Sequence, residues 1–411
     1  MMRSISATIR RDLTRDVAEL CAVIFIADVV SGVLSPTFSI FAEGLGVSLA
    51  LLGIITTVGG LTQLVLGLPI GIFSDRIGRP RVLLAGLTAF ILCMLATAAA
   101  AGPAMLLASR VLYGVAGVAT FSIGAAHLGD ITTREQRPFA FGLYTSCMGL
   151  GFTIGPLLGA QLADRFSAPT AYVVGAIIGV AGLALGVRIM LKSAPRQRSG
   201  AARSAGMSNV RGILRNRRLM LVTFGNMLMS LTFAGGISTF FPIYANELLI
   251  SQAAIGIMFA VRALVSTLGR LPNGIISRAL GSQSVMLSAL LLDTGVMLSI
   301  AHTSNITLLT VLLAVEGLAF GAYLVSGQTF VADNTEIQNR GAAIGVYSTA
   351  SSVGSSAAPF VLGLIANAYG VRLVFTVTGA ILGVGLIISI AASILLSRLG
   401  ASSLSAETAE P

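Results

Sequence analysis

The chain alternates between long apolar runs and short polar loops, and this pattern predicts its helices. A helix needs about 20 apolar residues to cross a bilayer core of about 30 Å. We count twelve runs of this kind in the sequence. They cover approximately residues 17–41, 49–72, 82–101, 104–129, 139–162, 168–191, 219–245, 252–276, 284–302, 305–331, 341–365 and 370–396. The pattern therefore predicts an all-α integral membrane protein with twelve transmembrane helices.

One polar stretch divides the runs into two sets of six. Residues 192–218 contain eight basic residues and no acidic residue. We predict an N-terminal six-helix bundle over 1–191, a basic linker over 192–218 and a C-terminal six-helix bundle over 219–398. Residues 399–411 are rich in Ser, Ala and Glu, a composition that favours a disordered tail.

The two halves repeat one another. A constant offset of 203 residues, the difference between positions 53 and 256, superimposes small and turn-forming residues of the first half on identical ones in the second. The matched pairs include Gly53 and Gly256, Pro69 and Pro272, Gly78 and Gly281, Asp130 and Asp333, Arg137 and Arg340, Tyr144 and Tyr347, and Pro156 and Pro359. Because each half has an even number of spans, the repeats are parallel and are related by an axis along the membrane normal.

Composition and charge agree with a membrane protein. Of the 411 residues, 55% are hydrophobic and 10% are charged, which is too apolar for a soluble protein of this length. The net charge of +10 could indicate nucleic-acid binding, but the basic residues are concentrated in alternate loops. Such asymmetry places both termini and the linker in the cytoplasm, with the linker near anionic lipid. We therefore expect no nucleic-acid partner.

Other chemistry has little support in the sequence. Cys21, Cys93 and Cys147 lie within apolar runs, where cysteine serves as a small packing residue. His127 and His302 have no second metal ligand at helical spacing. We see no nucleotide-binding loop and no combination of nucleophile, base and oxyanion donor. We expect no metal, no cofactor, no ATP-driven step and no enzymatic activity.

A charged loop between the second and third runs carries a recognisable signature. Its residues Gly71, Asp75, Arg76, Gly78 and Arg79 form the pattern G-x-x-x-D-R-x-G-R. This loop resembles that of the major facilitator superfamily, and most closely its bacterial drug/proton antiporter branch. Pro80 stands where the family commonly has a basic residue.

Two further signatures support the resemblance, which covers about residues 15–398. The fourth run has an arginine followed by glycines, at Arg110, Gly114 and Gly117. The fifth has the exporter-associated pattern at Gly151, Gly155, Pro156 and Gly159, with Ala160 in the last place. These three glycines recur every four residues, so they line one helix face where another backbone can approach. The resemblance implies that this surface is a pivot.

The resemblance also implies that Asp75 belongs to a lock that keeps the cytoplasmic side shut in the outward-open state. Asp130 and Arg137 are candidate partners. In the second half, Arg278 and Ala279 replace Asp75 and Arg76. We therefore predict an asymmetric lock, and the other interpretation is a simple topology anchor.

Ionisable residues near the bilayer centre are functional candidates because they are expensive to bury. By helical rise, Asp28, Arg262, Asp293 and Glu316 lie near the centre, and Arg110 lies nearer the outer side. The resemblance places spans 1, 4, 7 and 10 around the substrate path. We expect Asp28 first and Glu316 second to couple transport to protons, with Arg110 modulating them.

A static arrangement is the alternative. In it Asp28 pairs with Arg110 and Glu316 pairs with Arg262, and neither acid exchanges protons. Asp293, on a peripheral span, is expected to be structural and to be a partner for Arg262.

Few polar residues remain for the substrate. Candidates are Tyr113, Asn226, Arg262 and Tyr323, among mostly apolar neighbours. A largely apolar path suits amphipathic compounds better than sugars. We predict a monomeric secondary transporter of the bacterial inner membrane that exports small amphipathic or drug-like molecules in exchange for protons. The alternatives are a proton-coupled importer of a sugar, organic acid or amino acid, and a non-transporting receptor.

Overall fold

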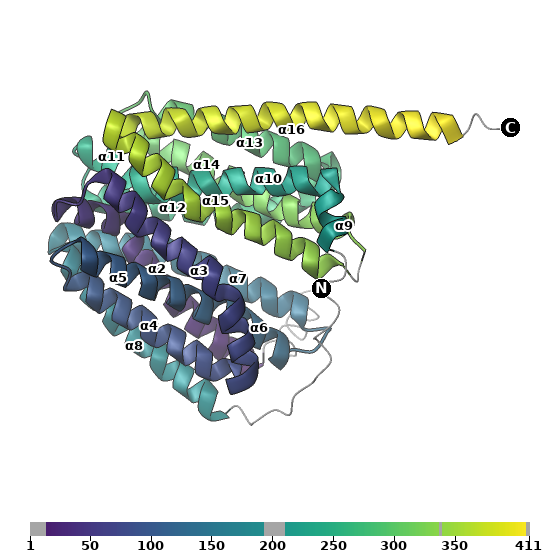
Figure 1. The fold of residues 1–411 in the computed structure, drawn as a ribbon. Helices are drawn as coiled ribbons and strands as arrows, with labels where there is room; N and C mark the ends of the chain where they lie inside the picture. The colour runs from purple at the N-terminus through teal and green to yellow at the C-terminus, as the bar shows by residue number, and fades with distance from the viewer. Residues whose placement is uncertain (1–13, 193–209, 337–338, 408–411) are drawn as a thin grey trace, which may run out of the picture.

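The computed structural model describes residues 14–192, 210–336 and 339–407, and these are helices joined by short turns (Figure 1). In this part of the chain, twelve helical spans are long and apolar enough to cross a membrane. The predicted fold class is confirmed.

The first half contains six spans among the described residues. They are α2 (Arg15–Gly44), α3 (Leu49–Ile77), α4 (Arg79–Ala98), a fourth span made of α5 (Pro103–Gly117), η1 (Val118–Ser122) and α6 (Ile123–Ile131), α7 (Arg137–Arg165) and α8 (Ala168–Lys192).

The second half has the same number of spans within the described residues. It contains a short helix α9 (Val210–Arg215), a seventh span made of α10 (Arg217–Leu231), η3 (Thr232–Phe240) and α11 (Phe241–Glu247), then α12 (Gln252–Leu280), α13 (Ser282–Ile300), α14 (Ile306–Asp333), α15 (Arg340–Tyr369) and α16 (Val371–Glu407). We call the end of the bundle where α2, α4 and α10 begin the basic end, because it carries Arg79, Arg137, Lys192, Arg217 and Arg340. The other is the opposite end.

The repeat extends to local geometry. Ser48 caps α3 and Ser251 caps α12, and in each case the serine Oγ accepts a hydrogen bond from the backbone N–H three residues later, at 3.3 and 3.2 Å. The turn that follows each of these helices has a glycine at positive φ, +100° at Gly78 and +83° at Gly281. Residues with a Cβ avoid this region, so both turns depend on glycine.

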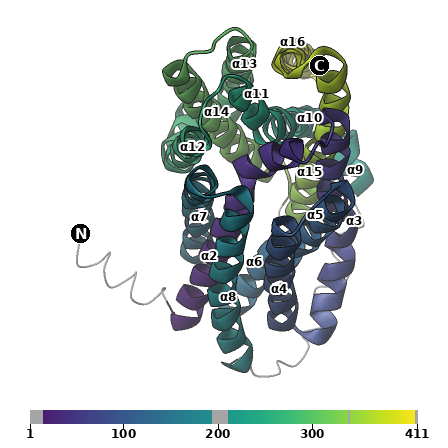
Figure 2. The ribbon, with the colours of Figure 1, turned by 90° about the vertical axis from the view of Figure 1, so that its left-hand side faces the viewer.

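The two halves meet through small residues of α3 with α15 and of α7 with α12, and Figure 2 shows both helix pairs side by side. A methyl group on Gly60 would lie 3.1 Å from Cβ of Ser356, and one on Gly256 would lie 2.9 Å from the carbonyl oxygen of Pro156. Closer to the basic end, Gly67 of α3 and Gly345 of α15 have open space beside them. The halves are therefore closed together toward the opposite end and separate toward the basic end.

Two spans contain π-helical segments, η1 in the fourth span and η3 in the seventh. In η3 the hydroxyl of Thr239 donates to the carbonyl oxygen of Ala234, five residues earlier, at 2.7 Å. Such segments shift the helix register and re-aim side chains, and they are frequent at functional sites. The repeat does not predict them, because α14, the counterpart of the fourth span, is α-helical throughout.

Helices extend into both segments that were predicted to be irregular, the linker over 192–218 and the tail over 399–411. α9 and the start of α10 occupy the end of the proposed linker, while 193–209 lie outside the described residues. α16 continues to Glu407, 408–411 lie outside the described part, and the disordered tail over 399–411 stays a prediction. Figure 1 shows α16 projecting past the other helices. Ala, Leu and Glu in this segment favour helix once a preceding helix has been nucleated.

Candidate functional site

A cluster of three charged side chains lies inside the C-terminal half. Arg262 of α12, Asp293 of α13 and Glu316 of α14 are 3%, 0% and 0% exposed. Arg262 Nη2 donates to Glu316 Oε1 at 2.8 Å, and Arg262 Nε donates to Glu316 Oε2. This two-point pairing satisfies part of the static arrangement considered above, and it holds both side chains in fixed orientations.

Asp293 is not paired in the same way. Both of its carboxyl oxygens are buried and have no hydrogen-bond partner among the described residues. It interacts electrostatically with Arg262 and with Glu316. The structure therefore gives Arg262 a different acid, Glu316, from the one proposed as its structural partner.

Aromatic rings surround Arg262 and connect the cluster to the other half. The guanidinium carbon lies 4.2 Å from the ring centre of Phe233 in η3 and 5.5 Å from that of Phe320 in α14. Phe233 in turn contacts Phe152 of α7, with ring centres 6.3 Å apart. These rings stabilise the cation and exclude water from the ion pair.

The N-terminal half buries an arginine without an acid. Arg110 of α5 is 8% exposed, and its guanidinium carbon lies 3.3 Å from the ring centre of Phe38 and 5.2 Å from that of Tyr113. Tyr113 shares a hydrogen bond of 2.8 Å with Ser31. Among the described residues no ion pair joins Asp28 to Arg110, so this half of the static arrangement is absent.

Asp28 of α2 lies where α2 packs against α7. It is 6% exposed, and a methyl group on Gly151 would lie 2.8 Å from its Cβ. Its carboxyl group interacts electrostatically with Arg270 of α12, which belongs to the other half. Arg270 Nε is itself buried without a hydrogen-bond partner in the described part of the chain. Sequence reasoning missed this proximity, because a long side chain near a helix end usually extends to the membrane surface.

The glycine stripe of α7 faces α2 within the same half. Methyl groups on Gly155 and Gly159 would lie 2.5 Å from the carbonyl oxygens of Val29 and Val33, so neither position has room for a side chain. An adjacent face of α7, with Pro156 and Ala160, meets Gly256 of α12. The stripe thus fixes α7 on α2, and its role as a pivot stays a prediction.

The predicted lock residues gather at the basic end, within the N-terminal half. Arg79 lies between two acids, with Nη1 2.9 Å from Asp130 Oδ2 and Nη2 3.4 Å from Asp75 Oδ1. Arg79 also donates to the carbonyl oxygen of Ala126. Arg137 Nη2 donates to the carbonyl oxygen of Gly129 at 3.1 Å. The link that holds this group together is Arg79, which connects α4 to the end of α3 and to α6.

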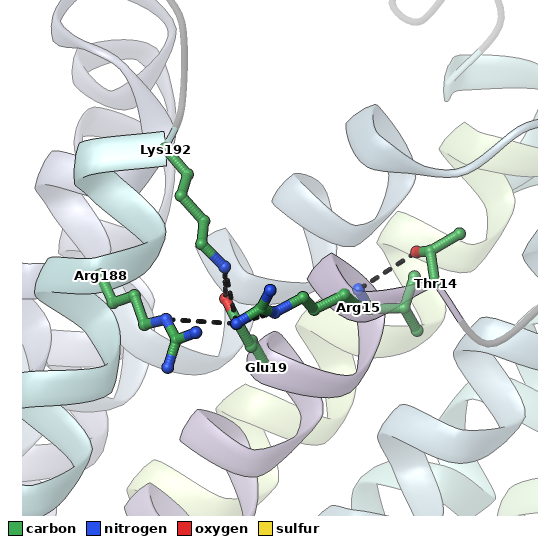
Figure 3. Close-up of polar contacts among 6 residues, drawn as sticks. Thr14, Arg15, Glu19, Arg188 and Lys192 are labelled. Atoms are coloured by element: carbon green, nitrogen blue, oxygen red, sulfur yellow. Dashed lines mark hydrogen bonds and ion pairs between the residues drawn. The ribbon is translucent and has the colours of Figure 1, made fainter.

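Sequence reasoning also missed an ionic cluster at the basic end (Figure 3). Glu19 of α2 accepts hydrogen bonds from Lys192 Nζ of α8 at 2.6 and 2.7 Å, and it pairs with Arg15 at 3.1 Å and with Arg188 at 3.4 Å. The cluster joins the first span to the sixth. Because the side chains of its cations are between 37% and 71% exposed, the cluster orients the helix ends more than it stabilises the fold.

The remaining candidate side chains make internal contacts in this conformation. Asn226 Nδ2 donates to the carbonyl oxygen of Tyr347 at 3.0 Å, and Tyr323 OH donates to that of Val222 at 3.0 Å. Tyr323 also lines a cavity of about 150 Å³ between α10, α13, α14 and α16, together with Arg218 and Ser389. This cavity does not include the charged clusters. A role for Asn226 and Tyr323 in the substrate path remains a prediction.

Comparison with known proteins gives a consistent result. The family model of the Major Facilitator Superfamily matches residues 20–249 and 223–410. Multidrug resistance protein MdtG of Citrobacter koseri is 25% identical over 319 residues, which is 76% of this chain and 77% of the relative. Tetracycline resistance protein, class C, of Escherichia coli is 33% identical over 142 residues, 34% of this chain and 35% of the relative.

Solved structures show the same fold at low identity. A mutant form of the nucleoside transporter NupG has a TM-score of 0.79 at 16% identity, with 92% of this chain and 100% of that chain covered. A bacterial homologue of the human lysosomal transporter Spinster, in an inward-facing and occupied conformation, has a TM-score of 0.78 at 16% identity, with coverage of 92% and 96%.

Proposed function

The chain belongs to the Major Facilitator Superfamily of membrane transporters, and on this premise we propose that it exports small amphipathic molecules in exchange for protons by alternating access. The observation that carries the proposal is Asp28, a buried carboxyl group that forms no ion pair with any described residue. It lies on the first span, at the junction of the two halves. Burying an acid at this depth costs free energy, and this cost makes Asp28 a candidate functional residue.

Asp28 can couple proton binding to the conformation of the protein through Arg270. Burial in an apolar environment favours the protonated form of a carboxyl group, whereas a nearby cation favours the ionised form. Ionised Asp28 attracts Arg270 across the junction, and a proton or a cationic substrate removes that attraction. A ligand shifts a conformational equilibrium by its difference in affinity for the two states. Competition between proton and substrate for Asp28 is therefore sufficient for antiport.

The conformation fits the loading step of an exporter. The positive-inside rule assigns the basic end to the cytoplasm. With that assignment, the separation of the halves toward the basic end and their contact toward the opposite end support an inward-facing conformation as part of the proposed cycle. In export, substrate enters from the cytoplasm in this state.

Aromatic side chains and the relatives support the substrate class. Phe152 and Phe233 meet where the halves join, and Phe320 lies beside them. Apolar rings bind flat amphipathic molecules without a specific pattern of hydrogen bonds. Relatives named for tetracycline and multidrug resistance make such compounds the first candidates to test.

Asp28→Asn is expected to impair proton-coupled export and to weaken the binding of cationic substrates, because asparagine has the shape of aspartate but neither titrates nor carries a negative charge. Coupling free energies between two binding sites typically correspond to about 5- to 150-fold effects, and we expect a loss in this range. The measurement is dissipation of an imposed pH gradient by candidate drugs in everted vesicles.

The exposed Asp164 of α7 offers a matched control, and Asp164→Asn should transport normally. If Asp28→Asn dissipates the gradient as the wild type does, the coupling role of Asp28 is excluded. If the wild type itself responds to no drug, and whole cells instead show uptake stimulated by external acid, the protein is an importer.

Asp75→Asn is expected to reduce transport at least about fivefold by changing the balance between conformations, with unchanged thermal stability. Its pair with Arg79 is exposed, so the pair contributes little to the free energy of unfolding. Transport rate and melting temperature should be measured together. Arg278→Ala, at the equivalent position of the second half, should have little effect, and an equal loss of transport there would contradict the asymmetric lock.

A further inference from the structure

The cluster of Arg262, Asp293 and Glu316 contains two acids and one base. Arg262 and Glu316 form a two-point ion pair, so their charges compensate one another. Asp293 remains, fully buried and seven residues before the end of α13 at Ile300, about 10 Å along the helix from that end. An ionised carboxylate at this depth without a partner costs many kcal/mol, and such groups become neutral instead.

No other charged group in the described part of the chain lies near Asp293 to compensate it. The helices packed against α13 are α14, α16 and α12. α14 contributes Glu316 and α12 contributes Arg262. The described side chains of α16 contribute only Arg372, which lies at the opposite end and donates to the carbonyl oxygen of Ala301. Within the described residues, the charge balance of this region depends on the three side chains alone.

The fold does not require an acid at this place. By the offset of 203 residues, Arg262, Asp293 and Glu316 correspond to Gly59, Phe90 and Tyr113 of the first half. Phe90 is 1% exposed and packs edge-on against Tyr113, with ring centres 5.9 Å apart. The equivalent site is therefore filled by an apolar contact, and a protonated acid without a hydrogen-bond partner adds no stability in its place.

From these observations we propose that Asp293 is a proton-binding residue of the C-terminal half, protonated in this conformation, while Glu316 remains the ionised partner of Arg262. The inference rests on the proposed proton-coupled export. The sequence predicted Glu316 as the second coupling residue. The proposal assigns that role to Asp293, which lies beside Glu316. The transporter then has one proton site in each half, Asp28 and Asp293.

Arg262 can accept the charge that forms when Asp293 releases its proton. Its bonds to Glu316 use Nε and Nη2, and a guanidinium has five N–H donors. A movement of α13 relative to α12 that brought the Asp293 carboxylate against Nη1 would stabilise its ionised form. The proton leaves to water, and the cluster changes from neutral to one negative charge shared around a single arginine. Substrate-driven movement of these helices would thereby change proton affinity.

The test is infrared difference spectroscopy of the purified protein in lipid, combined with proton counting in proteoliposomes. The wild type should show the C=O stretch of a protonated carboxyl group that is missing in Asp293→Asn and in Asp293→Leu, and present in Asp164→Asn. Both replacements should fold, since Phe90 occupies the equivalent site in the first half. Asp293→Asn should also lower the number of protons exchanged per substrate, and Asp293→Glu should restore it.

Two results would overturn the proposal. One is an unchanged carboxyl band in Asp293→Asn, which would mean that Asp293 is ionised. The other is a lost band with an unchanged number of protons per substrate, which would make the proton structural. A wild type that moves no protons with any substrate contradicts the proposed function separately, and it also excludes a coupling role for Asp293.

Discussion

Glu316→Gln is expected to destabilise the protein by about 3–5 kcal/mol, the usual effect of removing one partner of a buried ion pair. Glutamine removes the two-point ion pair of Arg262, which is 3% exposed in the interior of the C-terminal half, and Asp293 makes no hydrogen bond among the described residues that replaces it in this conformation. The rings of Phe233 and Phe320 compensate only part of the charge of Arg262. The melting temperature and the fraction of monodisperse protein in detergent report the loss.

A double replacement separates charge from packing. Arg262→Met with Glu316→Leu removes both charges and keeps a similar volume, and such changes are often neutral or stabilising. We expect the double variant to recover most of the stability lost by Glu316→Gln. Glu19→Gln, in the ionic cluster at the basic end whose cations reach solvent, is the matched control and should change stability little. A double variant as unstable as the single one would show that packing, and not the buried charge, decides the outcome.

A disulfide between Gly60→Cys and Ser356→Cys is expected to stop transport completely and reversibly. A methyl group on Gly60 would lie 3.1 Å from Cβ of Ser356, so a slight movement reaches the Cβ separation of about 3.5–4.5 Å found in disulfides. The bond joins α3 to α15, and thus the two halves, on the side where they are closed. Alternating access requires this contact to open.

The experiment needs a background in which Cys21, Cys93 and Cys147 have been replaced. Transport should fall to the background rate after mild oxidation and return with a reductant. The pair Gly67→Cys and Gly345→Cys, placed nearer the basic end where both positions have open space, should not cross-link. Full transport by the cross-linked protein would mean that this contact does not open during the cycle.

The elements were predictable where one local property determines them. A run of about 20 apolar residues has few alternatives to a membrane span, so the spans were found within a few residues of their ends. Gly78 and Gly281 predicted the same turn twice because only glycine adopts their backbone conformation easily. The C-terminal extent of α16 was not predicted, because the apolar pattern that marks a span ends before Glu407.

The site was predictable as a set of residues but not as a set of contacts. Burial of charge marked Asp28, Arg110, Arg262, Asp293 and Glu316 without indicating which would pair. Glu316 satisfies Arg262 because α12 and α14 pack together at that level, a fact of tertiary structure. The proximity of Arg270 to Asp28 likewise depends on how one half meets the other. Phe233 lies in η3 and contacts Arg262. The π-helical register of η3 could not be predicted, because it does not change the apolar pattern of the sequence.

The ring contact between Phe152 and Phe233 has a practical consequence. It joins the two halves beside a guanidinium, and the chain contains no tryptophan. Phe152→Trp would therefore introduce a single indole fluorophore at the junction, with no emission from other tryptophans. Its emission would differ between the joined and the separated halves, since indole responds to a nearby cation and to water. The aromatic contact thus marks a position from which the working cycle can be followed optically, in real time and without a labelled substrate.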